Sequence, residues 1–87
     1  MVIVVTRVGG DGSVLTRSVH TASRGDPGRW EALAGQATLG FLRPYRPQPG
    51  EPVYFVCAGE HEVQVAERDL DWPLRGLVIA VLAEGGC

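Results

Sequence analysis

The chain of 87 residues contains no lysine and no asparagine, and all eight of its basic side chains are arginines. Ten acidic side chains outnumber them, which gives a formal net charge of −2. Proteins that bind the phosphate backbone of nucleic acids normally have an excess of basic residues, so we expect no nucleic-acid partner. We interpret the exclusive use of arginine as the composition bias of a GC-rich genome rather than as eight sites for bidentate binding.

Cysteine is also scarce, with Cys57 in an apolar run and Cys87 at the end of the sequence. The two form no Cys-x-x-Cys motif, and no pair of histidines stands near them. We therefore expect free thiols, no metal site and no cofactor. The N-terminus lacks a basic leader, and its apolar segment 2–8 is too short to cross a membrane. These features predict a cytoplasmic protein without membrane contact.

The remaining composition is typical of one small globular domain. Hydrophobic residues make up 45% of the chain and charged residues 21%, which excludes a disordered tail. A length of 87 residues accommodates one domain and is too short for two. We assign residues 1–87 to a single domain with a small core.

β-Branched and apolar residues predict a first hairpin, with strands over 2–8 and 14–21 around a glycine-rich turn at 9–13. Its register depends on the length of the turn, and both alternatives are open. An odd number of turn residues places Ile3 on the face of Val19, whereas an even number places Val2 there.

A second hairpin is predicted from segments 53–58 and 61–66, which turn at Gly59-Glu60. A turn of two or four residues places Tyr54 and Val56 on one face of this hairpin and Phe55 on the other. Segment 43–52, which precedes it, contains four prolines and is expected to be an extended, stiff and exposed loop.

Two helices complete the pattern. Asp26 followed by Pro27 indicates the start of a helix over 27–38, and Asp71 is expected to cap a second helix that ends at Gly85-Gly86. Each helix has an apolar stripe at helical spacing. The stripes are Trp30, Leu33, Ala34 and Ala37 in the first helix and Leu74, Leu77, Val78, Val81 and Leu82 in the second.

These elements predict an α+β fold of order ββαββα, with a four-stranded antiparallel sheet and two helices packed on one face. The other face is then open, and apolar residues on it such as Phe55 need a partner or a second copy of the chain.

A catalytic constellation is not evident, so we expect no enzyme. His20 and His61 belong to different hairpins, and a Cys57–His61 dyad lacks any recognisable oxyanion hole. Arg7 and Arg17 are expected to face each other across the first hairpin. If the two arginines are exposed, they are solvated charges. If a partner binds there, their guanidinium groups bind its carboxylates with two hydrogen bonds each.

Four stretches in a fixed order resemble the emfourin family, which comprises small protein inhibitors of protealysin-type, thermolysin-like zinc metallopeptidases. The stretches are Arg7-Val8-Gly9-Gly10, Val19-His20-Thr21-Ala22, the tyrosine-containing hairpin 54–65, and the acidic and leucine-rich segment 69–77. The resemblance covers nearly the whole chain. It departs from the family pattern at Asp11-Gly12, where an aromatic residue is expected, at His20 in place of aspartate, and at Trp72.

The resemblance implies an emfourin-like domain that inhibits a bacterial thermolysin-like metallopeptidase by filling its substrate cleft with exposed loops. From local chemistry we expect the turn at 9–13 and the loop at 42–50 to make this contact. The candidate binding residues are Arg7, Gly9, Gly10, Asp11, Arg43, Tyr45 and Arg46. An alternative is a non-catalytic adaptor module that forms a homodimer through the open face of the sheet.

Overall fold

The computed structural model describes residues 1–23, 25–39 and 45–86 of the chain. Within these residues the elements are β1 (Val2–Val8), β2 (Val14–His20), the 3-10 turn η1 (Thr21–Ser23), α1 (Pro27–Leu39), β3 (Val53–Ala58), β4 (His61–Ala66), the 3-10 turn η2 (Glu67–Asp69) and α2 (Leu74–Glu84). The predicted strand 14–21 ends one residue early because Thr21 begins η1.

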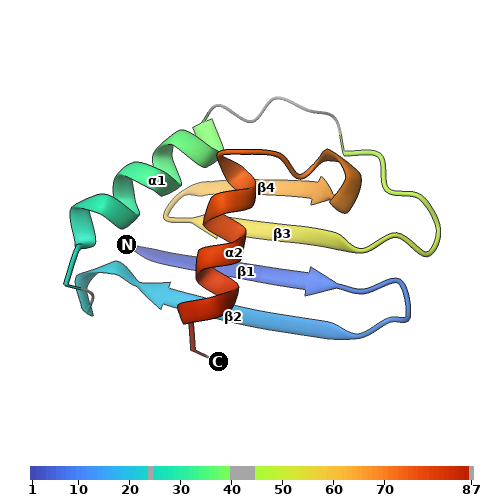
Figure 1. Cartoon of the computed structure of the whole chain (residues 1–87), viewed down its shortest axis with the longest axis horizontal. Helices are drawn as coiled ribbons and strands as arrows, with labels where there is room; N and C mark the ends of the chain where they lie inside the picture. The colour runs from blue at the N-terminus through green and yellow to red at the C-terminus, as the bar shows by residue number, and fades with distance from the viewer. Residues whose placement is uncertain (24, 40–44, 87) are drawn as a thin grey trace.

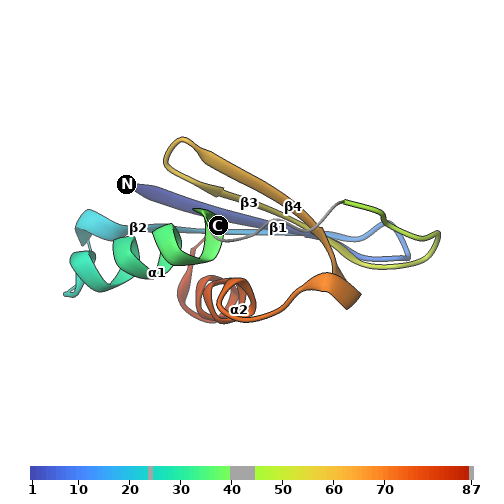
Figure 2. The same ribbon diagram turned by 90° about the horizontal axis from the view of Figure 1, so that it is seen from above.

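The four strands form one antiparallel sheet in the order β2-β1-β3-β4. The two hairpins therefore join through β1 and β3, which lie at the centre of the sheet (Figure 1). Both helices lie against the same face of this sheet (Figure 2). The predicted α+β fold of order ββαββα is confirmed.

The first hairpin has the register of an odd-numbered turn, which is one of the two predicted alternatives. Residues 9–13 connect the strands, Ile3 pairs with Val19, and Val5 pairs with Arg17. Ile3, Val5 and Val19 are fully buried. A shift of one residue between the strands would turn Val19 to the face opposite Ile3 and Val5, so the burial of all three side chains on one face selects this register.

The second hairpin has a two-residue turn at 59–60, where Gly59 has a φ of +62°. Tyr54 pairs with Val65, so Tyr54 and Val56 lie on the helix-covered face and are buried. Phe55 lies on the open face, as predicted for a turn of this length.

The core lies between the sheet and the two helices. Helix α1 buries Ala34 and Ala37, and Trp30 and Leu33 pack against the core while remaining partly exposed. Helix α2 contributes its predicted stripe, of which Leu74, Leu77, Val78 and Val81 are buried and Leu82 is partly buried. Both predicted stripes therefore face the sheet.

The start of α2 differs from the prediction. Its N-cap residue is Pro73 without a side-chain cap, whereas the Asp71 carboxylate accepts a hydrogen bond of 3.2 Å from the N–H of Trp72. A proline disfavours the helical backbone conformation in the residue before it, which here is Trp72. The helix therefore does not extend back through Trp72. Asp71 still contributes, because its carbonyl accepts the N–H of Arg75 at 2.8 Å.

The end of α2 agrees with the prediction and joins the helix to the sheet. Gly85 is the C-cap residue, and its N–H donates to the carbonyl of Val81 at 2.7 Å. Gly86 then exchanges two backbone hydrogen bonds with Ser18 of β2, at 2.8 and 3.0 Å. A Cβ on Gly85 would lie 2.8 Å from the Ser18 carbonyl oxygen, so the close approach requires glycine there.

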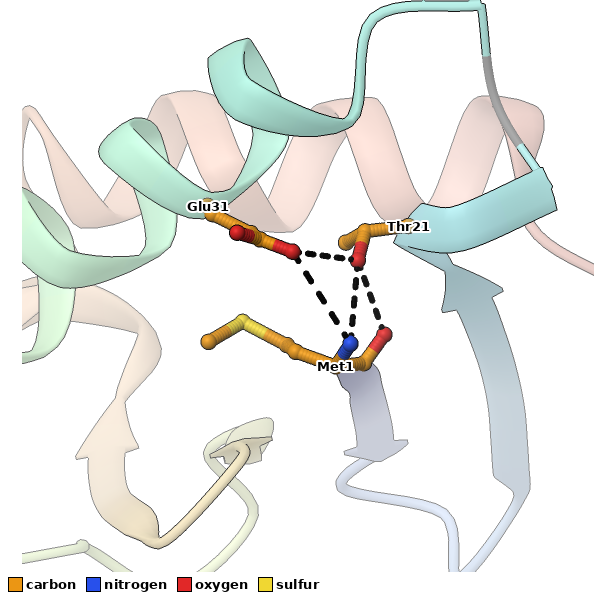
Figure 3. A network of polar contacts seen from close by, with 3 residues as sticks. All are labelled: Met1, Thr21 and Glu31. Carbon is orange, nitrogen blue, oxygen red and sulfur yellow. Dashed lines mark hydrogen bonds and ion pairs between the residues drawn. The ribbon is translucent and has the colours of Figure 1, made fainter.

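A polar cluster joins α1 to the start of β1 (Figure 3). The hydroxyl of Thr21, a fully buried residue, lies 3.1 Å from the nitrogen and 3.1 Å from the carbonyl oxygen of Met1. The same hydroxyl lies 3.0 Å from a carboxylate oxygen of Glu31 in α1. These contacts hold the helix at the end of the sheet opposite the loops described next (Figure 1).

Candidate functional site

Two loops that are distant in the sequence lie side by side at one end of the sheet (Figure 1, Figure 2). They are the tip of the first hairpin, residues 9–13, and the segment 45–52 before β3, and we call the pair the loop end. A Cβ atom added to Gly10 would overlap the backbone carbonyl of Gly50. The two backbones therefore touch with no side chain between them, which requires glycine at position 10. The structure thus brings together the described parts of both predicted binding loops.

The hairpin tip is held by its own hydrogen bonds. The N–H of Gly9 donates to the Ser13 carbonyl at 2.8 Å, and the N–H of Gly12 donates to the Gly9 carbonyl at 3.0 Å. The N–H of Ser13 donates to the Asp11 carboxylate at 3.0 Å. Hydrogen bonds from the side chain and the backbone of Ser13 lower the pKa of Asp11 from its ordinary value. An exposed carboxylate therefore stays ionised at the tip.

The second loop contains a β-turn that the sequence analysis described only as extended chain. The N–H of Glu51 donates to the Gln48 carbonyl at 3.1 Å, and Gly50 has a φ of +80°. Proline and glycine at the two central positions, here Pro49 and Gly50, are the residues that a type II turn favours. The Glu51 carboxylate accepts a hydrogen bond of 3.2 Å from the N–H of Gln48, which is a second hydrogen bond between the two ends of the turn.

Arg68 in η2 fastens this second loop to the end of β4. Its guanidinium donates to the Arg46 carbonyl at 2.6 Å and lies 3.8 Å from the Glu51 carboxylate. The N–H of Glu67 donates to the Pro52 carbonyl at 3.0 Å. The Pro52 end of the loop is therefore fixed by a backbone hydrogen bond and the Arg46 end by a charge-assisted one.

Tyr45 lies over the open face of the sheet. Its ring centroid is 6.3 Å from that of Phe55, with the two planes tilted by 58°. The Tyr45 side chain is 37% exposed, and Phe55 is partly buried. The loop therefore covers part of the apolar surface that was expected to need a partner.

Arg7 lies behind the hairpin tip on the helix-covered face. Its Nε–H donates to the Tyr54 hydroxyl at 3.3 Å, and this hydroxyl donates to the Glu67 carboxylate at 3.3 Å. The hydrogen bond with Tyr54 raises the pKa of Arg7 above its ordinary value. Arg7 thus links β1, β3 and η2 beneath the loop end and supports it from within.

Arg7 and Arg17 do not face each other as expected. The register pairs Arg7 with Leu15 and Arg17 with Val5, so the two arginines share a face but stand diagonally. The cause is the five-residue turn, which places Arg17 two residues along the strand from Leu15, the partner of Arg7.

The seven predicted binding residues occupy different parts of this end. Gly9, Gly10 and Asp11 form the tip, Tyr45 and Arg46 belong to the second loop, Arg7 supports both from below, and Arg43 lies outside the described residues. Four residues that hold the loops in place were not predicted, and Gly50 was predicted only as part of the loop at 42–50. The four are Glu51, Tyr54, Glu67 and Arg68. The Pro-Gly pair signals the turn, but the contacts of Arg68 join residues far apart in the sequence and leave no local signal.

The strand register separates the candidate catalytic groups. Cys57 lies on the open face opposite Glu62, whereas His61 pairs with Ala58 on the other face. Cys57 is a free thiol, and Cys87 lies outside the described residues. Among residues 1–23, 25–39 and 45–86, no three His, Cys, Asp or Glu side chains gather in a way that would hold a metal ion.

Comparison of the chain with protein-family models, with curated proteins and with solved structures gives no significant match. In the part of the chain that the structure describes, the helices are too short or too polar to span a membrane.

Proposed function

We propose that this protein inhibits a bacterial thermolysin-like, protealysin-type zinc metallopeptidase, and that the loop end enters the substrate cleft of the enzyme. The observation that carries the proposal is the backbone contact between Gly10 and Gly50. It joins two loops, which were predicted separately from their local chemistry, into one protruding surface. The family resemblance of the sequence supplies the class of target.

The construction of the loop end suits a segment that binds a peptidase without being cut. An inhibitor loop that is already ordered loses little conformational entropy on binding. The second loop is stiffened by prolines at positions 47, 49 and 52 and by the hydrogen bond from Arg68 to the Arg46 carbonyl. A peptide bond in such a loop resists the conformational change that cleavage requires.

The surface of the loop end fits an enzyme cleft in its chemistry as well. It offers exposed backbone at the tip, one exposed carboxylate at Asp11 and one aromatic ring at Tyr45. Aromatic side chains commonly contribute a large share of the binding energy at protein interfaces. Such a surface acts by occupying the cleft and needs no catalytic group of its own.

The test is a titration of a protealysin-type peptidase with the purified protein. We expect activity to fall to zero near one equivalent, while mass spectrometry shows the inhibitor uncleaved. The variant Gly10→Ala forces the hairpin tip away from Gly50 and is expected to weaken inhibition by at least about tenfold. The matched control is Gly28→Ala in α1, where an added Cβ meets no atom within 4 Å.

Circular dichroism of both variants separates loss of the loop contact from loss of the fold. Full activity of several thermolysin-like enzymes in the presence of excess protein would contradict the proposed function. Inhibition that Gly10→Ala leaves unchanged would instead contradict the role of the loop end.

The adaptor or homodimer that uses the open face remains a second candidate. Val14, 65% exposed, and Val2, 42% exposed, lie on that face. Tyr45 shields Phe55 at its centre, which reduces the apolar area available to a partner. Sedimentation equilibrium of the wild type and of Val14→Glu tests this face, because a charge placed there should abolish a dimer that forms through it.

A further inference from the structure

Asp11 carries the exposed carboxylate of the loop end. This end contains two acidic residues, Asp11 and Glu51, and neither histidine nor cysteine. The Glu51 side chain is 17% exposed, and its carboxylate already accepts the N–H of Gln48 and lies against Arg68. Asp11 is exposed at the hairpin tip. Since zinc in proteins is bound by cysteine, histidine, aspartate and glutamate, Asp11 is the residue of the loop end that can reach a zinc ion outside the molecule.

The hairpin tip holds this carboxylate in place and leaves space around it. Its Oδ1 atom accepts the N–H of Ser13 at 3.0 Å, and its neighbours in the chain are Gly10 and Gly12. Neither neighbour has a side chain that would obstruct a narrow site. Gly10 touches the backbone of Gly50, so Asp11 directly follows the contact that joins the two loops. A carboxylate has about four acceptor positions, so the hydrogen bond from Ser13 leaves others for a metal ion.

A zinc peptidase has a complementary group in its substrate cleft. The catalytic zinc ion binds three protein ligands and one water molecule, and this water is the nucleophile that attacks the substrate. If a peptide carbonyl of an inhibitor were bound at this zinc ion, it would be polarised for attack like that of a substrate. A carboxylate in that position offers no peptide bond to cleave, and its negative charge is attracted by the cation. A loop that enters the cleft uncut therefore requires a group such as the Asp11 carboxylate at the zinc ion.

We propose that the Asp11 carboxylate binds the catalytic zinc ion of the target peptidase, an assignment that rests on the proposed function of the loop end. A bond forms between a carboxylate oxygen and the zinc ion, and the bond between the zinc ion and its water breaks. The water leaves as a neutral molecule, so no proton or electron is transferred. The enzyme thereby loses its nucleophile. The zinc ion and its other ligands belong to the enzyme, because one carboxylate is too few ligands to hold the ion by itself.

The charge state of Asp11 suits this contact. Hydrogen bonds from the side chain and the backbone of Ser13 hold the pKa of Asp11 below its ordinary value. The carboxylate is therefore ionised when the loop end meets the enzyme, and no proton has to be removed before it binds the zinc ion.

The first test is inhibition of a protealysin-type peptidase by the wild type and by Asp11→Asn. Asparagine has nearly the same shape and can still accept the N–H of Ser13, but its neutral amide is a much weaker zinc ligand than a carboxylate. We expect the inhibition constant to rise by about a hundredfold. The matched control is Glu60→Gln, which removes an exposed carboxylate from the other hairpin turn, at the opposite end of the sheet (Figure 1). It should leave the inhibition constant unchanged.

The second test replaces the zinc ion of the peptidase by Co²⁺, whose visible absorption responds to the ligand in the open position. We expect one equivalent of the wild type or of Glu60→Gln to change this spectrum. Asp11→Asn, added at a concentration that saturates the enzyme, should leave the spectrum close to that of the free cobalt peptidase. Circular dichroism verifies that each variant is folded.

The outcomes separate the zinc contact from the proposed function. A wild type that does not inhibit contradicts both. Inhibition that Asp11→Asn leaves unchanged overturns the zinc contact alone. The zinc contact is also overturned if Asp11→Asn inhibits poorly but the wild type does not alter the cobalt spectrum, since the carboxylate then binds a protein group of the enzyme. An equal loss of inhibition in Glu60→Gln would assign the effect to net charge and overturn it as well.

Discussion

Asp11 and its neighbours at the hairpin tip form a small turn that is held by hydrogen bonds among its own residues. The Asp11 carboxylate accepts the N–H of Ser13 at 3.0 Å, and Gly12 between them has a φ of +87°. Glycine is the residue that adopts this conformation without strain. Asp11-Gly12 thus forms a hydrogen-bonded turn that presents no aromatic side chain at the tip.

The ionisation of Asp11 is predicted to depend on Ser13. The side-chain and backbone hydrogen bonds of Ser13 stabilise the carboxylate and lower the pKa of Asp11 in the folded protein. This contribution to stability is present above the pKa of the unfolded chain and is lost as the pH falls through the lower folded value. Removing the hydroxyl by Ser13→Ala should therefore raise the Asp11 pKa toward that of an ordinary aspartate.

NMR titration of the Asp11 carboxyl carbon measures this shift in the wild type and in Ser13→Ala. The control is Ser13→Thr, which retains a hydroxyl and should retain most of the lowered pKa. An Asp11 midpoint that is the same in the wild type and in Ser13→Ala would refute the role of the hydroxyl.

At the scale of elements, the two hairpins and η2 are held together beneath the loop end by one buried tyrosine. Tyr54 of β3 accepts a hydrogen bond from Arg7 of β1 and donates one to Glu67 of η2. The ring is part of the core, whereas the hydroxyl reaches the polar end of the sheet. The tyrosine thus serves packing through its ring and connects three elements through its hydroxyl.

Tyr54→Phe retains the ring and removes both hydrogen bonds. We expect the free energy of unfolding to fall by about 0.5–1.5 kcal/mol, since Arg7 and Glu67 lose a partly buried partner. Urea denaturation measures the change. The control Tyr45→Phe retains the ring contact with Phe55 and should change the free energy of unfolding by less than about 0.5 kcal/mol. Equal effects of the two substitutions would show that the Tyr54 hydroxyl has no special role.

At the scale of the whole molecule, the C-terminal glycines connect the last helix to the edge strand β2. Gly85 passes between the carbonyl groups of Val81 and Ser18, and Gly86 forms the two hydrogen bonds with Ser18. Together they connect the last element of the chain to the second. Because α2 supplies much of the core, this connection positions the helix across the sheet.

Gly85→Ala tests this connection. The added methyl group would lie 2.5 Å from the Val81 carbonyl oxygen and 2.8 Å from that of Ser18, so helix or strand must move. We expect the free energy of unfolding to fall by about 1–3 kcal/mol in urea denaturation. At Gly86 an added Cβ meets no atom within 4 Å, so Gly86→Ala should have little effect. A neutral Gly85→Ala would mean that the end of α2 adjusts without loss.

Apolar periodicity predicted the elements, their order and the faces buried by the helices and the second hairpin, whereas it left two registers open for the first hairpin. Period-two patterns located the strands, helical stripes such as the one from Leu74 to Val81 located the helices, and turn length selected the register of the second hairpin. The start of α2 was misjudged because the capping signal of Asp71 was given more weight than the restriction imposed by Pro73 on the residue before it.

The loop end was predicted in its parts but not as a unit. Its two turns follow from glycine and proline chemistry, which is local and therefore readable in the chain. Three of its contacts join residues that are far apart in the sequence. Gly10 touches the backbone of Gly50, Arg68 donates a hydrogen bond to the second loop, and the Tyr45 ring packs against Phe55. Such contacts arise from the pairing of β1 with β3, because only the assembled sheet carries the two loops to the same end.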